Sequence, residues 1–172
     1  MSDASDRAAR TRTHTWYPAA PDWEAMKRLS GVEYLRRAFA DERTRPPIAS
    51  LLGMRAVAFE PGRAVFEAEP AEFHYNPIGT VHGGFAATLL DSAMACAVHA
   101  ACKPGQAYTT VEIKVNYVRP ITADTGTVTC EGRTISLGSR IATAEARITD
   151  PQGRLLAHAT ATCLLIPLER PG

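Results

Sequence analysis

The segment Gly83–Cys102 is apolar on almost every side of a helical projection, and it constrains the fold more than any other part of the chain. It contains a single carboxylate, Asp91, and begins with the glycine pair Gly83-Gly84. A carboxylate near the centre of a bilayer helix costs roughly 2.5–3.5 kcal/mol, which disfavours a membrane span. A helix without a polar face must otherwise be covered by protein on all sides. The segment therefore predicts a long buried helix, about Gly83–Ala101, at the centre of a soluble domain.

Segments of alternating apolar and polar residues lie on both sides of this helix and predict six strands. Two precede the helix as a hairpin around the turn 60–62, and four follow it with short turns between them. Four successive strands with short turns predict an antiparallel meander. The predicted strands are residues 53–59, 63–69, 109–119, 126–135, 140–149 and 154–166. The fold class is therefore α+β, with an antiparallel sheet wrapped around one long central helix.

The strand predicted at residues 109–119 carries the clearest alternation. Its apolar residues would share one buried face, and the polar residues between them would share the other face. The apolar set is Val111, Ile113, Val115 and Tyr117, and the polar set is Thr110, Glu112, Lys114 and Asn116.

Residues 1–47 predict an extension to this domain, which itself covers residues 48–168. Residues 1–18 are polar and without periodicity, so we expect a disordered arm. Residues 22–43 predict two helical pieces: Asp22 can cap the first, and Ser30 with Glu33 forms a capping box at the second. We expect the helical part to pack on the main domain as a lid or brace.

Charge and cysteine usage exclude several classes of function. The formal net charge is +1, which gives no electrostatic reason to expect a nucleic-acid partner. None of the cysteines forms a C-x-x-C pair or has a histidine at metal-ligand spacing, so we expect reduced core thiols and no metal site. The first 18 residues contain no apolar signal segment, so we expect a cytoplasmic protein. The four cysteines are Cys96, Cys102, Cys130 and Cys163.

The start of the central helix and the carboxylate inside it together indicate acyl chemistry. Free amides at a helix N-terminus carry partial positive charge, and Gly83-Gly84 would let a carbonyl oxygen approach them closely. Asp91 lies about two turns further along, where it would serve as a general base or a nucleophile. Each feature also has a structural explanation: tight packing for the glycines, a helix cap for His82, a turn for Asn76, and a buried partner for Asp91. The combination favours acyl transfer to water.

The run from Asn76 through His82-Gly83-Gly84 to Asp91 resembles the signature of the PaaI-like branch of hotdog thioesterases. Asn76 lies six residues before His82, and Asp91 lies nine residues after it, as in that branch. The resemblance covers about residues 48–166. It implies a hotdog fold, a homodimer whose sheets join edge to edge, a further pairing into a dimer of dimers, and an active site at the dimer interface.

The resemblance also implies roles for individual residues. The Gly83 amide would bind the thioester oxygen, Asn76 and His82 would orient that group, and Asp91 of the other subunit would activate water or attack directly. Thr110 would help to hold the water, although it is equally an ordinary strand threonine. Substrate-binding candidates are Gly84, Tyr117, Arg119 and the turn residues Ser136, Gly138, Ser139 and Arg140.

The function implied is hydrolysis of acyl-CoA to a free acid and coenzyme A, with no cofactor besides the coenzyme A of the substrate. One alternative is a hotdog protein that binds acyl-CoA without turnover. Another is an enoyl-CoA hydratase, but Asp91 and His99 lie eight residues apart, too far for one hydrogen-bonded pair. The resemblance does not fix the acyl group, and it leaves both the nucleophile and the base role of Asp91 open.

Overall fold

The central helix α4 (Gly83–Ala101) is present with the predicted bounds. The fold is a computed structural model that describes residues 8–168, so the predicted arm residues 1–7 lie outside the described residues. Most of α4 is buried, from Phe85 to Ala100. Among the described residues, α4 is the one helix with the length and composition of a membrane span, yet 67% of that stretch is buried inside the protein. This burial is what the sequence predicted for a core helix.

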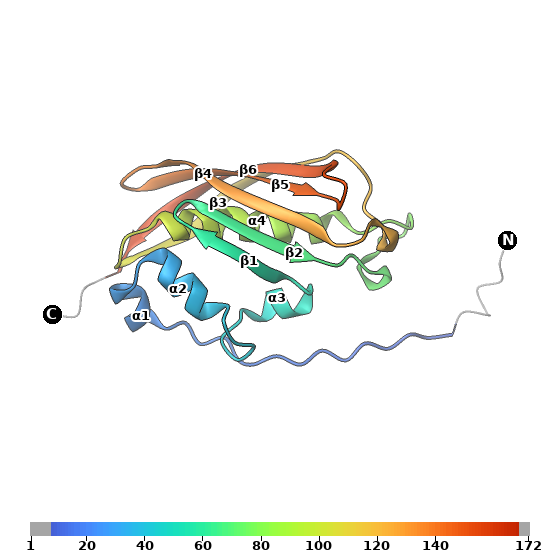
Figure 1. Ribbon diagram of the computed structural model, residues 1–172, viewed down its shortest axis with the longest axis horizontal. Helices are drawn as coiled ribbons and strands as arrows, with labels where there is room; N and C mark the ends of the chain where they lie inside the picture. The colour runs from blue at the N-terminus through green and yellow to red at the C-terminus, as the bar shows by residue number, and fades with distance from the viewer. Residues whose placement is uncertain (1–7, 169–172) are drawn as a thin grey trace.

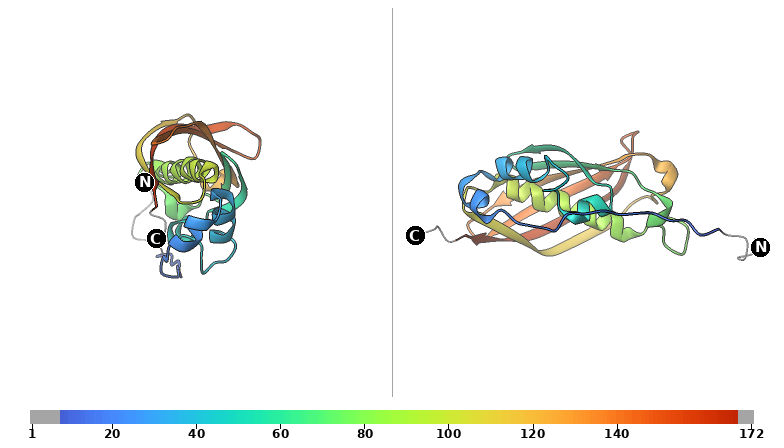
Figure 2. Two further views of the ribbon diagram at one scale, coloured as in Figure 1. Left: turned by 90° about the vertical axis from the view of Figure 1, so that its left-hand side faces the viewer. Right: turned by 90° about the horizontal axis from the view of Figure 1, so that it is seen from below.

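Six antiparallel strands form one sheet that curls around α4, as Figure 1 and the end-on view of Figure 2 show. The order across the sheet is β1-β2-β4-β5-β6-β3. The α+β hotdog architecture expected from the sequence is therefore confirmed. The strands are β1 (Arg55–Glu60), β2 (Arg63–Ala68), β3 (Gln106–Tyr117), β4 (Val128–Leu137), β5 (Ile141–Thr149) and β6 (Leu155–Pro167).

The prediction of a four-strand meander after the helix was wrong in one respect. β4, β5 and β6 follow one another across the sheet, but β3 pairs with β6 rather than with β4. The reason is that β2 occupies the free edge of β4. β3 instead finds its partner in β6, the other long strand, and forms an edge of the sheet. The connection from β3 to β4 contains the short 3-10 helix η3 (Ala123–Thr125).

A β-bulge in β3 changes the predicted division of its two faces at Thr110 and Val111, whereas Ile113, Val115 and Tyr117 still share one face, opposite buried alanines of β6. The pairing with β6 shifts between Thr110 and Glu112, so that Val111 has no partner residue. A bulge inserts one residue and reverses the alternation beyond it. Val111 is consequently 56% exposed, and the Thr110 side chain turns inward to α4. The regular alternation in the sequence gave no sign of this irregularity.

The sheet packs directly onto the backbone of α4 at one point in β4. A Cβ atom on Gly132 would lie 2.3 Å from the carbonyl oxygen of Ala93 on the helix. Only glycine allows such an approach, which explains why a residue with poor strand propensity lies within the strand.

The N-terminal extension covers the side of α4 that the sheet leaves open (Figures 1 and 2). It contains α1 (Trp23–Arg28), α2 (Gly31–Ala38) and α3 (Pro47–Leu51). The Asp22 cap and the capping box of Ser30 and Glu33 are both confirmed. The helical part ends at Ala38, five residues before the predicted end, and α3 was not predicted. Pro47 begins α3, because proline suits the first turn of a helix.

The described part of the arm, residues 8–22, has neither helix nor strand and runs along the open side of the molecule (Figure 1). Arg10 forms an ion pair with Glu72, and the Arg12 guanidinium lies 4.1 Å from the centre of the Phe73 ring. These contacts tie the arm to the 3-10 helix η2 (Glu72–His74), which precedes the loop of the predicted site.

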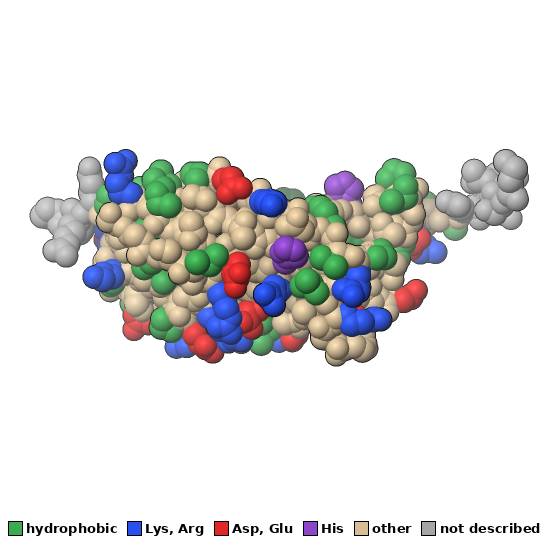
Figure 3. All heavy atoms as spheres, turned by 90° about the horizontal axis from the view of Figure 1, so that it is seen from above, with side chains coloured by type: hydrophobic (Ala, Val, Ile, Leu, Met, Phe, Trp, Pro, Cys, Tyr) green, Lys and Arg blue, Asp and Glu red, His purple; other side chains and the backbone are tan. Residues whose placement is uncertain are grey.

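The outer face of the sheet, seen in Figure 3, carries acidic and basic side chains together rather than a patch of one sign. Glu131, for example, contacts both Arg63 and Arg133. All four cysteines are free and buried, as predicted. Within residues 8–168, no cluster of three or more acidic, histidine or cysteine side chains has the arrangement of a metal site.

Candidate functional site

The loop before α4 is organised by Asn76. Its side-chain oxygen accepts hydrogen bonds from the amides of Ile78 and Thr80, and its amide group donates to the Thr80 hydroxyl. The backbone closes the same loop through the Asn76 amide and the Thr80 carbonyl, 2.8 Å apart. Asn76 therefore shapes the loop that leads to His82. The structural explanation, a turn former, is realised, and one amide hydrogen of Asn76 remains for a ligand.

The His82 side chain caps α4. Its Nδ1 atom accepts a hydrogen bond from the Gly84 amide at 2.9 Å. An imidazole nitrogen that accepts carries no proton, so in the neutral ring the proton lies on Nε2 and can be donated outward. The His82 amide is also fixed, because it donates to the His74 carbonyl at 2.7 Å.

The Gly83 amide is the one donor at this helix start that stays free. Gly84 donates to His82 Nδ1, and Phe85 donates to the His82 carbonyl. No hydrogen bond among the described residues uses the amide of Gly83. An unpaired N–H in the first turn points outward with the positive end of the helix dipole. This is the geometry that the sequence predicted for an oxyanion-binding donor.

A cavity of about 500 Å3, the Gly83 cavity, opens beside this amide between the loop and the end of β3. Asn76, His82, Gly83, Tyr117 and Arg119 all contribute to its wall. The Tyr117 hydroxyl donates to the Gly83 carbonyl at 3.1 Å, and a Cβ atom at Gly83 would lie 3.0 Å from the tyrosine ring. The structure therefore brings five of the predicted site residues together.

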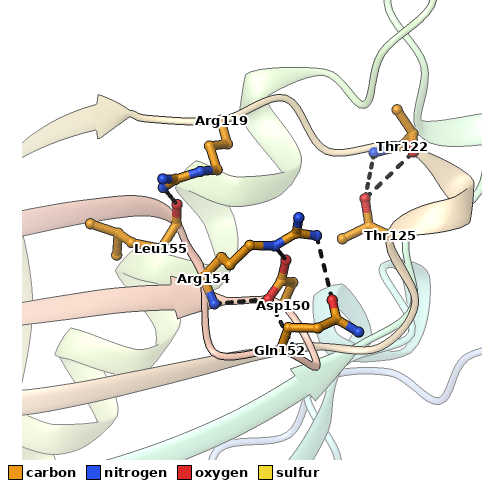
Figure 4. A network of polar contacts seen from close by, with 7 residues as sticks. All are labelled: Arg119, Thr122, Thr125, Asp150, Gln152, Arg154 and Leu155. Carbon is orange, nitrogen blue, oxygen red and sulfur yellow. Dashed lines mark hydrogen bonds and ion pairs between the residues drawn. The ribbon is translucent and has the colours of Figure 1, made fainter.

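Arg119 projects from the chain just after β3 and is anchored by its own sheet (Figure 4). One of its terminal nitrogens donates to the Leu155 carbonyl at 2.6 Å. Arg154 in the same view is bound to the buried carboxylate of Asp150, and that pairing keeps the pKa of Asp150 below its usual value despite burial. Of these two arginines, Arg119 is the one that lines the Gly83 cavity.

Asp91 faces the inward side of β3. The Thr110 hydroxyl donates to its Oδ1 atom at 3.0 Å, and no described residue forms a hydrogen bond with Oδ2. Thr110 reaches this position because of the bulge at Val111. Bulges often re-aim side chains beside active sites. Asp91 and Thr110, both site candidates from the sequence, therefore contact each other within a single chain.

Gly83 and Asp91 are too far apart to act on one atom within the same chain. They lie eight residues apart on a continuous helix, which is about 12 Å along its axis at 1.5 Å per residue. One chain therefore presents two half-sites: the Gly83 cavity and the Asp91–Thr110 pair.

The turn Ser136–Arg140 lies at the other end of the sheet from Gly83. It joins β4 to β5, and the neighbouring residue Ile141 pairs with Leu164 near the end of β6. Within one chain, the structure does not bring Ser136, Gly138, Ser139 or Arg140 to the Gly83 cavity. Gly84 lies at the cap, but its amide is already bound to His82.

A larger cavity of about 740 Å3, the extension cavity, lies between the N-terminal extension, α4 and β3. Asp91 and Thr110 contribute to its wall, and so do Tyr34, His99 and Tyr108, which sequence reasoning did not select. His99 lies eight residues after Asp91, a spacing that places both on one face of a helix. That spacing is the signal in the sequence that points to His99.

His99 is an unusual histidine. It is 2% exposed, and neither ring nitrogen has a hydrogen-bond partner among the described residues. Burial lowers the pKa of its imidazole to about 4, so the ring is neutral near pH 7. The rings of Tyr34 and Tyr108 pack against the imidazole in tilted orientations, and each ring centre lies 5.3 Å from the imidazole centre.

The thiols near Asp91 are not nucleophiles. Burial raises the pKa of Cys96 to about 12 and also raises the pKa of Cys163. Thiols attack as thiolates, and these remain protonated near pH 7. Asp91 is therefore the candidate reactive side chain of its half-site.

Known proteins share this fold and this segment. The family model for the thioesterase superfamily matches residues 78–157, which include Gly83, Asp91 and Thr110. A 1,4-dihydroxy-2-naphthoyl-CoA hydrolase of Listeria monocytogenes is 29% identical over 111 residues, which cover 64% of this chain and 89% of that protein. Acyl-coenzyme A thioesterase 13 of Homo sapiens is 37% identical over 68 residues, which cover 37% of this chain and 45% of the human protein.

A solved structure is similar over nearly its whole length. The phenylacetic acid degradation protein PaaI from Thermus thermophilus, solved as a point mutant, is 30% identical with a TM-score of 0.63. The match covers 69% of this chain and 98% of that protein. The uncovered part of this chain is large enough to contain the N-terminal extension.

Proposed function

The chain belongs to the thioesterase superfamily and is a thioester hydrolase, and from that membership we propose that it hydrolyses acyl-CoA to a free acid and coenzyme A at a site shared by two subunits. The observation that carries this proposal is the pair of half-sites on α4. One offers a free amide to an oxygen that gains negative charge, and the other offers a carboxylate to water. Hydrolysis of a thioester needs both functions.

The Gly83 amide supports the first function. It would donate to the thioester oxygen as that oxygen becomes negative in the tetrahedral intermediate, and such a donor changes rates by roughly 10²–10³. His82 would add a second donor from Nε2, because Nδ1 is already bound to the Gly84 amide. Asn76 acts mainly by holding the loop that places both groups.

Asp91 supports the second function. As a base it would accept a proton from water while the water oxygen bonds to the thioester carbon. The C–S bond then breaks, and the departing thiolate of coenzyme A takes up a proton. As a nucleophile its oxygen would attack the same carbon directly, and the C–S bond would break to give a mixed anhydride and the thiolate of coenzyme A. Water would then hydrolyse the anhydride to the free acid and restore the Asp91 carboxylate. In either case the Thr110 hydroxyl fixes one oxygen of Asp91 and leaves the other for the reaction.

The separation of the half-sites supports a homodimer with a shared site. β3 is an edge strand, with β6 on one side and unpaired backbone groups on the other. It also exposes apolar side chains that a partner would cover, notably Val111, Ile113 and Tyr117. Pairing of two β3 edges would bring Asp91 of one subunit toward Gly83 of the other. We expect such dimers to pair into a homotetramer in the cytoplasm, without a cofactor.

Coenzyme A as the leaving group is supported by the relatives and by a cationic side chain. The hydrolase of Listeria monocytogenes and the human thioesterase both have names that specify a coenzyme A thioester as substrate. Arg119 at the Gly83 cavity is suited to a phosphate group, since a guanidinium pairs well with phosphate oxygens. The turn Ser136–Arg140 would contribute only from the second subunit, because it is remote from Gly83 within one chain.

Replacement of Asp91 by asparagine tests the proposal. We expect Asp91→Asn to lower kcat by at least about 100-fold, because the amide is neither a base nor a nucleophile. The assay is the release of free thiol from phenylacetyl-, benzoyl-, hexanoyl- and palmitoyl-CoA. Asp124→Asn, at an exposed position in η3, is the matched control and should keep wild-type activity.

Three outcomes would contradict the proposal. Asp91→Asn at wild-type rate would remove the assigned role of the carboxylate. A wild-type protein that binds acyl-CoA without releasing thiol would be a binding protein. A wild-type protein that consumes the enoyl absorbance of crotonyl-CoA without releasing thiol would be a hydratase.

A further inference from the structure

The extension cavity begins at the reactive carboxylate. Asp91 and Thr110 lie in its wall, and the cavity continues along one face of α4 through Ala95 and Cys96 to His99. The Gly83 cavity is separate and shares no wall residue with it. An acyl group whose carbonyl carbon lies at Asp91 therefore has a continuous space ahead of it in the subunit that provides Asp91.

The walls of this space are mostly apolar. Met26 and Leu35 come from the extension, Met54 comes from the segment before β1, and Ala95 and Cys96 come from α4. Its volume of about 740 Å3 lies within the usual range for small-molecule sites. The apolar part of this lining suits a hydrocarbon chain, and the two basic side chains in the wall, Arg43 and Arg45, lie on the segment between α2 and α3.

At the end of the space near His99, the start of α2 packs against the last turn of α4. The Gly31 amide donates to the Cys102 carbonyl at 3.2 Å, and a Cβ atom on Gly31 would lie 1.7 Å from the His99 carbonyl oxygen. This contact fixes α2 against the last turn of α4. Tyr34, one helical turn later, places its ring against His99.

The end of the space at His99 is polar. His99 has two unpaired ring nitrogens there. A hydrocarbon chain pressed against them would leave both nitrogens unpaired, which is unfavourable in a buried site. The Tyr34 ring lies beside His99 in the cavity wall and adds a steric limit, so polarity and shape together oppose an aliphatic chain that extends beyond this point.

We infer that the extension cavity is the acyl chamber of the subunit that supplies Asp91, and that Tyr34 is the residue that sets the upper limit of acyl length. The inference rests on the proposed thioesterase function and adds a substrate class to it, medium-length acyl groups. The distance from Asp91 to His99 is about 12 Å along α4, which is the span of an extended chain of about eight to ten carbons. Octanoyl-CoA is thus a better substrate than palmitoyl-CoA.

Truncation of Tyr34 tests the length limit. The wild type is expected to show a higher kcat/KM for octanoyl-CoA than for palmitoyl-CoA. Tyr34→Ala removes the ring beside His99 and should raise the ratio of kcat/KM for palmitoyl-CoA to kcat/KM for octanoyl-CoA by at least about 10-fold. This is the lower end of the discrimination that a pocket achieves between substrates differing by one methylene group. Tyr34→Phe keeps the ring and should keep the wild-type ratio. Tyr17→Ala, in the arm outside the cavity wall, is the matched control and should do the same.

A binding measurement separates this inference from the proposed function. Titration calorimetry with octanoate and hexadecanoate needs no turnover, so it applies even to a wild type that releases no thiol. Tighter binding of octanoate by the wild type and a relative gain for hexadecanoate in Tyr34→Ala support the chamber. A wild type that hydrolyses acyl-CoA while Tyr34→Ala keeps the wild-type ratio, in turnover and in binding, overturns the chamber and leaves the proposed function intact.

Discussion

Gly83 combines two properties that no other residue would provide together. Its amide is free at the first position of α4, and its lack of a Cβ atom leaves room for the Tyr117 ring, whose hydroxyl donates to the Gly83 carbonyl. The Gly84 amide is not free, because it donates its hydrogen bond to Nδ1 of His82. At the scale of single residues, the site is a helix start in which one donor is left free for a ligand.

Proline at position 83 removes this donor with little change in the backbone. Proline is favoured at the first position of a helix, and the extended conformation of His82, with φ −59° and ψ 137°, suits a residue before proline. We expect Gly83→Pro to lower kcat by roughly 10²–10³, the effect of losing one oxyanion donor. The measurement is steady-state hydrolysis of octanoyl-CoA.

Gly83→Ala is the control for the proline variant. It introduces the same Cβ atom near Tyr117 but keeps the amide, so it should retain far more activity than Gly83→Pro. Equal losses in the two variants would attribute the effect to crowding of Tyr117 and would refute the role of the amide.

His99 makes the stability of the protein depend on pH. Its pKa in the folded protein is about 4, below the ordinary value of 6.5, because burial disfavours the charged ring. The unfolded chain therefore binds a proton first as the pH falls, and stability decreases between pH 6.5 and 4 by up to about 3 kcal/mol. Urea denaturation should show a shallower decrease over this window for His99→Leu than for the wild type.

His158→Leu is the control for that comparison, because His158 lies on the outer face of β6 between buried alanines. The His158→Leu variant should show the same decrease in the free energy of unfolding between pH 6.5 and 4 as the wild type. If His99→Leu showed the same decrease as the wild type, the buried imidazole would not be its source.

The residues that the sequence identified are those whose chemistry is local. A helix start with two glycines and a lone carboxylate in an apolar helix can both be seen in one segment of chain. Tyr34, His99 and Tyr108 come from α2, α4 and β3, and their meeting depends on how the extension docks. The cavity that these three residues line could therefore not be predicted from the sequence.

The elements show the same division between local and distant information. The caps of α1 and α2 and the bounds of α4 were predicted correctly, because capping boxes and apolar periodicity operate within a few residues. The partner of β3 was not, because strand pairing is decided by which edges other strands have already taken. The bulge at Val111 also depends on pairing, and it is the feature that aims Thr110 at Asp91.

The docking of α2 depends on Gly31. Alanine there would place a methyl group against the backbone of His99, where no flexible side chain can yield. We expect Gly31→Ala to lower the free energy of unfolding by roughly 1–3 kcal/mol, as overpacking does. Urea denaturation measures this loss. Glu42→Ala, at an exposed position in the extension, should stay within about 0.5 kcal/mol of the wild type, and equal stability of both variants would refute the tight contact.

At the scale of the whole molecule, the proposed function makes one chain half of a working unit. The sheet and the extension enclose α4 almost completely, yet Gly83 and Asp91 on that helix are about 12 Å apart and face different cavities. The β3 edge is the part of the molecule where a second chain would bring them together. In this arrangement the Gly83 side of the site would hold coenzyme A, and the subunit that provides Asp91 would hold the acyl group.

Complementation between two inactive variants tests this shared site most directly. Asp91→Asn and Gly83→Pro are each expected to be nearly inactive alone, but a mixed dimer contains one site in which both groups are intact. Co-expression at equal levels should restore about a quarter of the wild-type activity, since half of randomly formed dimers are mixed and each has one intact site of two. If the co-expressed pair shows no more activity than the separate variants, each subunit acts alone and the shared site is wrong.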